Sequence, residues 1–327
     1  MIYLWYNQLY LPLKKNYSNK TILLASLFFM TGMLLSCDGS SGKNTSPKSI
    51  NTDSIHQAEE EKVEPVPEPL IIKYQLDSIT SVQHRDSVFG LFSEKEERNI
   101  LLLNRIEKSR VKAGTRLVVP DTLFEDFLKY SPFPENLAYL DSIPKTVLIA
   151  QRIQAFALYE KGLLIHWGPV SSGKQSTPTP NGLNYANFKS KRKVSTVDPD
   201  WIMPYYFNFM NYYGVGVHQY LLPGYPASHA CVRLDMDDAM FIFDWAVPWK
   251  LDSRGKYLVK NGTPFMVFGE YDFKAQVPWL DLANNPDANK INASELETIK
   301  KYVKDYMADD KNFEKEEIEK EENSLGV

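Results

Sequence analysis

Three short β-rich runs lie close together in the middle of the chain. They cover residues 146–150, 155–159 and 163–167, and they are built mostly of apolar, β-branched and aromatic residues. The links between them are polar, and the second link contains Gly162. Short runs separated by polar turns are typical of antiparallel strands, and none of these runs is long enough for a helix of several turns. The middle of the chain is therefore predicted to be mainly β.

A small mixed unit is predicted before these strands, over residues 71–122. A leucine-rich run at 100–106 has helical spacing, and after a turn at Gly114 the chain becomes β-branched as far as Pro120. A connector over 123–144 leads from this unit to the β-rich part. The length of 327 residues fits roughly two domains, and a net charge of −4 is too small to imply a nucleic-acid partner.

The N-terminal segment has the pattern of a targeting signal. Three lysines precede an apolar run at 21–35, which is too short to span a bilayer and reads as a signal-peptide core. The run ends in Leu34-Leu35-Ser36-Cys37, which resembles a bacterial lipoprotein box. That resemblance implies removal of the residues before Cys37 and lipidation of Cys37, so that a periplasm-facing lipoprotein is anchored to a bacterial membrane. An uncleaved membrane anchor is the alternative.

Residues 38–70 are predicted to form a solvated tether between this anchor and the folded part. The stretch is rich in polar residues, glutamate and proline, and it carries too little apolar surface to offset the entropy lost on ordering. At the other end, residues 276–327 are predicted to form a charged helical tail that opens with a capping box at Ser294 and Glu297. Its last residues are expected to fray.

The second cysteine of the chain, Cys231, is the candidate nucleophile. If Cys37 carries lipid, Cys231 has no partner for an intramolecular disulfide, and a lone cysteine in an oxidising compartment suggests reactivity. In an extended run at 228–234, His229, Cys231 and Arg233 would share one face. An imidazole within reach can take the proton of a thiol, which indicates acyl transfer through a thioester. A buried structural cysteine is the alternative reading.

The order and spacing of motifs from about residue 145 to 273 resemble those of the YkuD-type L,D-transpeptidase catalytic domain. The motifs are Gln154, Ser172-Gly173, Thr179-Pro180-Asn181-Gly182, Met203-Pro204-Tyr205, Gly216-Val217-His218, Leu222-Pro223-Gly224-Tyr225-Pro226-Ala227 and Ser228-His229-Ala230-Cys231-Val232-Arg233-Leu234. The resemblance implies a β-sandwich or barrel of antiparallel strands with short helices over residues 145–275.

The same resemblance assigns roles to the site. Cys231 is the nucleophile, His229 its general base and later acid, and the carbonyl of Ser228 fixes the tautomer of the imidazole. His218 lines the pocket, with a buried packing histidine as the alternative. Arg233 either orients a carboxylate of the substrate or braces the loop.

Two further positions complete the predicted site. Tyr205 is expected to contact substrate or brace the site. Ala230 departs from the glycine usual in the family, and its methyl group either tightens the turn that presents the thiol or crowds the acyl carbonyl. No metal and no cofactor are expected.

The implied reaction takes the acyl group of a peptidoglycan stem tetrapeptide, releases its terminal D-Ala and transfers the acyl group to an amine. The alternatives are hydrolysis of the same bonds, as a carboxypeptidase or in releasing wall-bound proteins, and a non-catalytic wall-binding lipoprotein. A nucleotide partner is excluded, because the Gly-x4-Gly-Lys match at 168–174 is followed by Gln175 and by a proline-rich run that forbids a helix.

Three local predictions remain. Residues 104–120 resemble the second half of a LysM domain, which implies contact with glycan strands, although a structural spacer of similar size is equally compatible. The basic run at 189–193 is expected to be a solvated hairpin tip, with attraction to anionic wall polymer as the alternative. Residues 235–245 are expected to form a short helix behind the nucleophile loop.

Overall fold

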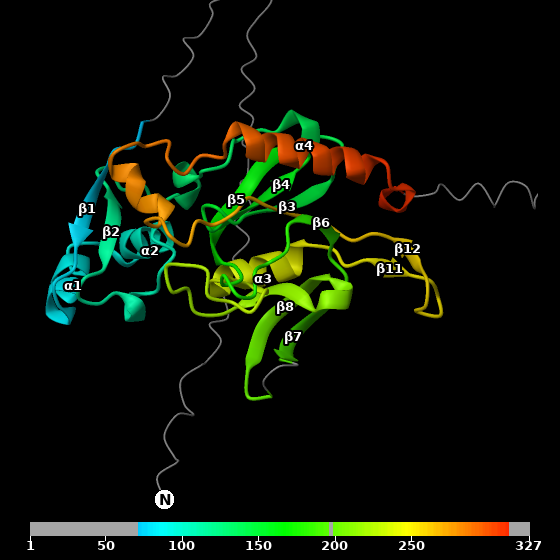
Figure 1. Cartoon of the computed structure of the whole chain (residues 1–327), viewed down its shortest axis with the longest axis horizontal. Coiled ribbons are helices and arrows are strands. Elements are labelled where there is room, and N and C mark those ends of the chain that lie inside the picture. Colours follow the sequence, from blue (N-terminus) through cyan, green and yellow to red (C-terminus); the bar gives the residue numbers. More distant parts are fainter. Residues whose placement is uncertain (1–70, 196–198, 314–327) are drawn as a thin grey trace, which may run out of the picture. The chain divides into compact units, whose positions relative to one another are not determined.

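The computed structural model describes residues 71–195 and 199–313, all of which belong to one compact unit (Figure 1). The predicted signal peptide with Cys37, the predicted tether at 38–70 and the last part of the predicted tail lie outside the described residues. In the described part, no helix is long and apolar enough to cross a membrane.

The first elements form the small mixed unit that the sequence predicts. Strand β1 (Tyr74–Ser78) is followed by helices α1 (Val82–Phe89) and α2 (Glu94–Leu103), and β2 (Arg116–Pro120) pairs antiparallel with β1. Asn104 caps α2, and its side chain exchanges two 2.8 Å hydrogen bonds with the backbone of Val118 in β2. This asparagine therefore ties the helix end to the sheet.

One nine-stranded sheet dominates the rest of the described chain, in the order β6-β13-β3-β4-β5-β10-β9-β8-β7. Its strands are β3 (Lys145–Ala150), β4 (Ala155–Glu160), β5 (Leu163–Ser171), β6 (Gly182–Tyr185), β7 (Lys189–Val194), β8 (Ile202–Met210), β9 (Val215–Gln219), β10 (Val232–Leu234) and β13 (Pro264–Phe268). The terminal strands β6 and β7 are consecutive in the chain and are separated only by residues 186–188. The sheet must therefore curl until its two ends meet.

The predicted fold class is confirmed, and the expectation of antiparallel strands holds for every pairing of this sheet except two. Strand β13 pairs parallel with β3, and β10 pairs parallel with β9. The two strands of each parallel pair are joined by a long connection. A prediction based on short turns between neighbouring strands does not detect such a pairing. The sheet is therefore mixed.

Each face of the sheet has its own core. Alternate residues of β3 show this, because Val147 and Ile149 belong to one apolar cluster while Leu148 and Ala150 belong to the other. Helix α3 (Met236–Trp245) packs on the first cluster, as predicted for the helix behind the nucleophile loop, and helix α4 (Ala293–Met307) packs on the second (Figure 1).

The remaining elements are short. A small hairpin consists of β11 (Lys250–Leu251) and β12 (Leu258–Lys260). Short 3₁₀ helices cover Lys108–Arg110, Phe127–Tyr130, Ala138–Leu140, Asn211–Tyr213, Pro278–Ala283 and Asp310–Asn312.

Two local predictions are corrected. The basic run at 189–193 is not a hairpin tip, because it forms most of β7 and pairs with β8. The capping box of α4 is made by Asn292 and Glu295 and not by Ser294 and Glu297. Both residue pairs fit the sequence pattern of a capping box. The helix begins at Ala293, so Asn292 is the N-cap residue.

The small unit packs against the chain segment that leads to Cys231. The N–H of Glu107 donates to the carbonyl of Leu222 at 3.0 Å, and the N–H of Gly224 donates to the carbonyl of Arg105 at 2.8 Å. Arg98 also forms an ion pair with Asp235 at 2.6 Å. The unit thus braces both sides of the segment at 228–234, which contains Cys231.

Candidate active site

The chain turns sharply immediately before Cys231. Ala230 has a φ of 74°, and only residues 232–234 of the predicted extended run form a strand, β10. The expectation that His229, Cys231 and Arg233 share one extended face is therefore wrong. A left-handed alanine costs roughly 1–2 kcal/mol because its Cβ crowds the backbone, whereas glycine pays no such penalty. The methyl group of Ala230 thus strains the turn that presents the thiol.

Both backbone polar groups of Ser228 form hydrogen bonds. Its N–H donates to the carbonyl of Ser172 at 3.0 Å, and its own carbonyl accepts the N–H of Lys174 at 2.8 Å. The hydroxyl of Thr177 reaches the same carbonyl at 3.3 Å. These donors occupy the carbonyl that the sequence assigned to the imidazole of His229, so the contact of Ser228 is with the loop and not with that ring.

Thr179 connects the proline-rich loop to the turn before Cys231. Its hydroxyl accepts the N–H of Gly173 at 2.9 Å and donates to the carbonyl of Ala230 at 2.7 Å. Gly173 has no room for a side chain, since a Cβ there would lie 2.3 Å from the carbonyl oxygen of Thr177. One buried hydroxyl thus fixes the loop and the strained residue before Cys231 together.

Replacing Thr179 with valine should damage activity and stability together. The change leaves the buried N–H of Gly173 without an acceptor, which costs about 1–3 kcal/mol of unfolding free energy. We expect acyl-enzyme formation to slow more than tenfold, because the carbonyl of Ala230 is released. Urea unfolding and thiol acylation rates measure the two effects. Thr179→Ser is the matched control and should stay within threefold of wild type; equal behaviour of both variants would contradict the assigned role.

Cys231 is half-buried and lies against β9. Its Sγ is 3.8 Å from the carbonyl oxygen of Gly214, the acceptor to which the thiol donates. Burial raises the pKa of Cys231 above its ordinary value, while a hydrogen bond from the backbone of Gly216 acts in the opposite direction. The hydroxyl of Tyr206 also donates to the carbonyl of Gly214, at 2.8 Å. Cys231 therefore rests as a neutral thiol.

His218 lies on β9 in register with Arg233 of β10. It is fully buried, and its Nδ1 is 2.9 Å from the carbonyl oxygen of Gln219. A carbonyl only accepts hydrogen bonds, so Nδ1 carries the hydrogen and Nε2 keeps its lone pair. Nε2 has no hydrogen-bond partner among the described residues. Burial lowers the pKa of His218 to about 4, Arg233 adds to the decrease, and the hydrogen bond to Gln219 opposes it.

His229 has a different environment. It is exposed, and its Nε2 is 2.8 Å from the ammonium nitrogen of Lys174, which can only donate. The lone pair of Nε2 is thereby occupied, and no hydrogen bond joins this ring to Cys231 within the described chain. The indole of Trp201 contacts both imidazoles, with ring centroids 6.3 Å from His218 and 5.8 Å from His229.

Arg233 and Tyr205 both take packing or bracing positions. One guanidinium nitrogen of Arg233 donates to the carbonyl of Ala227 at 3.0 Å, and its Cζ lies 4.6 Å from the ring centroid of Tyr220. Of the two predicted roles of Arg233, these contacts correspond to the bracing one. Tyr205 has a φ of 50° and packs edge-on against Phe243 of α3 at 5.6 Å.

Five residues make specific contacts in the site that the sequence did not predict. They are Lys174, Thr179, Trp201, Tyr206 and Gly214. Thr179 belongs to a motif already recognised, so a signal existed for it, whereas Lys174 and Gly214 carry no signal without the fold. No group of three or more His, Cys, Asp or Glu side chains in the described ranges is placed to hold a metal ion.

A family model describes this part of the chain. Residues 145–267 match the L,D-transpeptidase catalytic domain, YkuD. This segment is a YkuD catalytic domain. It contains nearly the whole curled sheet, the buried His218 and the turn before Cys231. No curated protein matches the chain.

Solved L,D-transpeptidases are also similar to parts of this chain. One from Stackebrandtia nassauensis is 25% identical with a TM-score of 0.32, and the match covers 40% of this chain and 58% of that one. One from Mycobacterium smegmatis is 20% identical with a TM-score of 0.31, covering 38% and 59%. A third, from Xylanimonas cellulosilytica, is 20% identical with a TM-score of 0.36, covering 62% and 100%. The chain thus spans less than two thirds of the first two relatives.

Proposed function

We propose that the protein is a peptidoglycan L,D-transpeptidase that works by cysteine acyl transfer. The observation that carries the proposal is the arrangement around β9, which carries a neutral, buried imidazole and pairs with β10, the strand that begins directly after the neutral thiol of Cys231. The YkuD domain supports the reaction class. The base in this proposal is His218, in place of His229 as inferred from the sequence, because only His218 has a free Nε2 lone pair.

The reaction proceeds in two acyl-transfer steps. The thiol of Cys231 attacks the carbonyl between an L-centre and the terminal D-Ala of a stem tetrapeptide while Nε2 of His218 takes the thiol proton. Backbone N–H groups of the turn at Ala230 stabilise the oxyanion, and one such donor is typically worth roughly 3–4 kcal/mol. The proton passes to the departing amine of D-Ala. An acceptor amine then attacks the thioester and loses its proton to His218, the carbon–sulfur bond breaks, and the released thiolate of Cys231 takes that proton back from His218.

The pH dependence of catalysis and of thiol alkylation should show that Cys231 and His218 are both neutral in the resting protein. Because the pKa of His218 is lowered to about 4, its base form is present from about pH 5 upward, and kcat/KM should fall only near pH 4. Because the pKa of Cys231 is raised, alkylation by iodoacetamide should keep accelerating into the alkaline range. A plateau of alkylation between about pH 5 and 7 would instead indicate a thiolate–imidazolium ion pair and contradict this arrangement.

Products separate the proposal from its alternatives. The pure protein is incubated with a stem tetrapeptide, with and without an acceptor amine, and the products are identified by mass spectrometry. Cross-linked peptide together with free D-Ala supports transpeptidation. Shortened peptide alone in the presence of acceptor would indicate hydrolysis. Absence of turnover would indicate a non-catalytic protein, the alternative that the strained backbone of Ala230 favours.

The proposed setting is the bacterial envelope, with a lipid anchor on Cys37 and a tether to the folded unit. Support for the anchor comes from the sequence alone, through the resemblance at 34–37 to a lipoprotein box. Glycan binding by the unit at 71–122 stays a prediction. Incorporation of labelled palmitate that is lost in Cys37→Ala tests the anchor, and retained incorporation would contradict it.

A further inference from the structure

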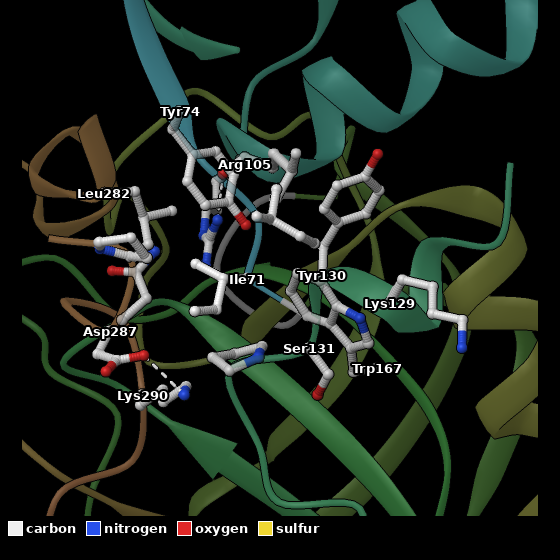
Figure 2. Close-up of a pocket in the computed structure, with 15 residues that line it drawn as sticks. Ile71, Tyr74, Arg105, Lys129, Tyr130, Ser131, Trp167, Leu282, Asp287 and Lys290 are labelled. Carbon is white, nitrogen blue, oxygen red and sulfur yellow. Dashed lines mark hydrogen bonds and ion pairs between the residues drawn. The ribbon is translucent and has the colours of Figure 1, made fainter. Parts of the chain in front are cut away.

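A cavity of about 360 Å³ lies at the start of β1, and none of the residues assigned to acyl transfer lines it (Figure 2). Its wall is formed by Ile71 and Tyr74 of the small unit, by Trp167 of β5 and by the segment at 282–290 that precedes α4. The volume falls at the lower end of the range of small-molecule sites, about 300–1,000 Å³. The cavity is therefore large enough for a small organic ligand.

Arg105 is a buried cation in this wall. Only 1% of its surface is exposed, and no carboxylate of the described chain forms an ion pair with it. Its Nε donates to the carbonyl of Ile153 at 3.2 Å and its Nη1 to the carbonyl of Leu103, which leaves Nη2 without a described partner. Trp279 lies on the guanidinium, with its ring centroid 4.7 Å from Cζ. Burial lowers the pKa of Arg105 to about 9, so the group remains charged at neutral pH.

Isolated buried charges are costly unless they are paired. Carbonyl oxygens and an indole ring stabilise a guanidinium only partly, because neither carries a full negative charge. Carboxylates bind guanidinium through charge-assisted hydrogen bonds, which are about twice as strong as neutral ones. The missing counter-charge of Arg105 therefore points to an anionic ligand.

Asn289 offers a hydrogen-bond acceptor to the cavity, whereas Arg105 offers donors. Its side chain lines the same cavity and is 4% exposed, and its Oδ1 has no hydrogen-bond partner in the described part of the chain. An amide oxygen is an acceptor, so it is satisfied by a ligand N–H or O–H. Chloride and sulfate offer no such hydrogen.

Charge at the rim favours the entry of an anion. Lys129 and Lys290 are exposed lining residues, and Asp287 is the lining carboxylate, paired with Lys290 at 2.6 Å (Figure 2). Lys129 forms no ion pair with a described residue. Cationic side chains therefore outnumber acidic ones around the cavity.

We propose that this cavity binds a small organic carboxylate that also carries an amide or hydroxyl hydrogen. The carboxylate pairs with the guanidinium of Arg105, and the hydrogen is donated to Oδ1 of Asn289. The site is separate from acyl transfer at Cys231, although the carbonyl of Arg105 also holds Gly224 in the segment before the nucleophile.

Three matched probes test the two contacts on the full chain. N-acetylglycine carries both a carboxylate and an amide hydrogen, acetate lacks the amide, and N-acetylglycinamide lacks the carboxylate. Isothermal titration should show N-acetylglycine binding at least tenfold more tightly than either analogue. Absence of binding, or equal affinity for N-acetylglycinamide, overturns the proposal without any variant.

Variants then place the binding in this cavity. Arg105→Gln and Asn289→Ala should each weaken N-acetylglycine binding at least tenfold, while Lys112→Gln, an exposed lysine of the same small unit, should change it less than twofold. Asn289→Ala removes no charge, so it tests whether N-acetylglycine binds in this cavity even if Arg105→Gln fails to fold. Unchanged affinity in Asn289→Ala, or equal losses in Lys112→Gln, overturns the assignment. Titrations in a Cys231→Ala background should give the same affinities, because the nucleophile takes no part.

Discussion

His218→Gln should lower the rate of acyl-enzyme formation by about 10²–10⁴-fold, the usual contribution of a general base. Glutamine keeps a polar group of similar size at this buried position but cannot take the proton of Cys231. The hydrogen bond between Nδ1 of His218 and the carbonyl of Gln219 fixes the tautomer, so the lost function is that of Nε2. Intact-mass kinetics with a stem tetrapeptide measure the rate.

His229→Gln is the matched comparison for this prediction. His229 is exposed and its Nε2 faces Lys174, so its loss should slow acylation less than tenfold. Circular dichroism melting curves check that both variants fold. If His229→Gln is the slower variant while His218→Gln stays near wild type, the base is His229, and the inference from the sequence is the correct one.

Cys231→Ala should abolish transfer, with a loss of at least about 10⁴-fold, because removal of a nucleophile leaves only binding and oxyanion stabilisation. Labelling by a carbapenem should disappear with it. The fold should survive, since Sγ contributes one long contact, 3.8 Å from the carbonyl oxygen of Gly214.

Cys231→Ser provides the control for shape. Serine keeps the size and a hydroxyl, but a hydroxyl is a far weaker nucleophile than a thiol beside the same base. We expect it to fold like wild type and to remain inactive. Persistent carbapenem labelling of Cys231→Ala would show that another residue is acylated.

The sequence predicts those parts of the fold that depend on neighbouring residues. The strands β3, β4 and β5 follow from alternating apolar runs and polar turns, and α3 follows from helical spacing. The parallel pairs β3–β13 and β9–β10 join segments far apart in the chain, so no local pattern reports them.

The sequence likewise predicts only part of the candidate site. Motif order predicts Cys231 as the nucleophile and brings His218, His229 and Arg233 into consideration. The choice between two histidines depends on burial and hydrogen bonding in three dimensions, which are set by the pairing of β9 with β10. The strained φ of Ala230 likewise depends on the turn, and it breaks the extended face that the residue spacing suggested.

The most direct test of the central claim is the intact mass of the protein after brief incubation with a stem tetrapeptide in the absence of an acceptor amine. The account predicts an adduct with the mass of the tetrapeptide less D-Ala, attached to the peptide that contains Cys231 and absent from Cys231→Ala. Unmodified protein throughout the time course, with no D-Ala released, would contradict acyl transfer by this thiol.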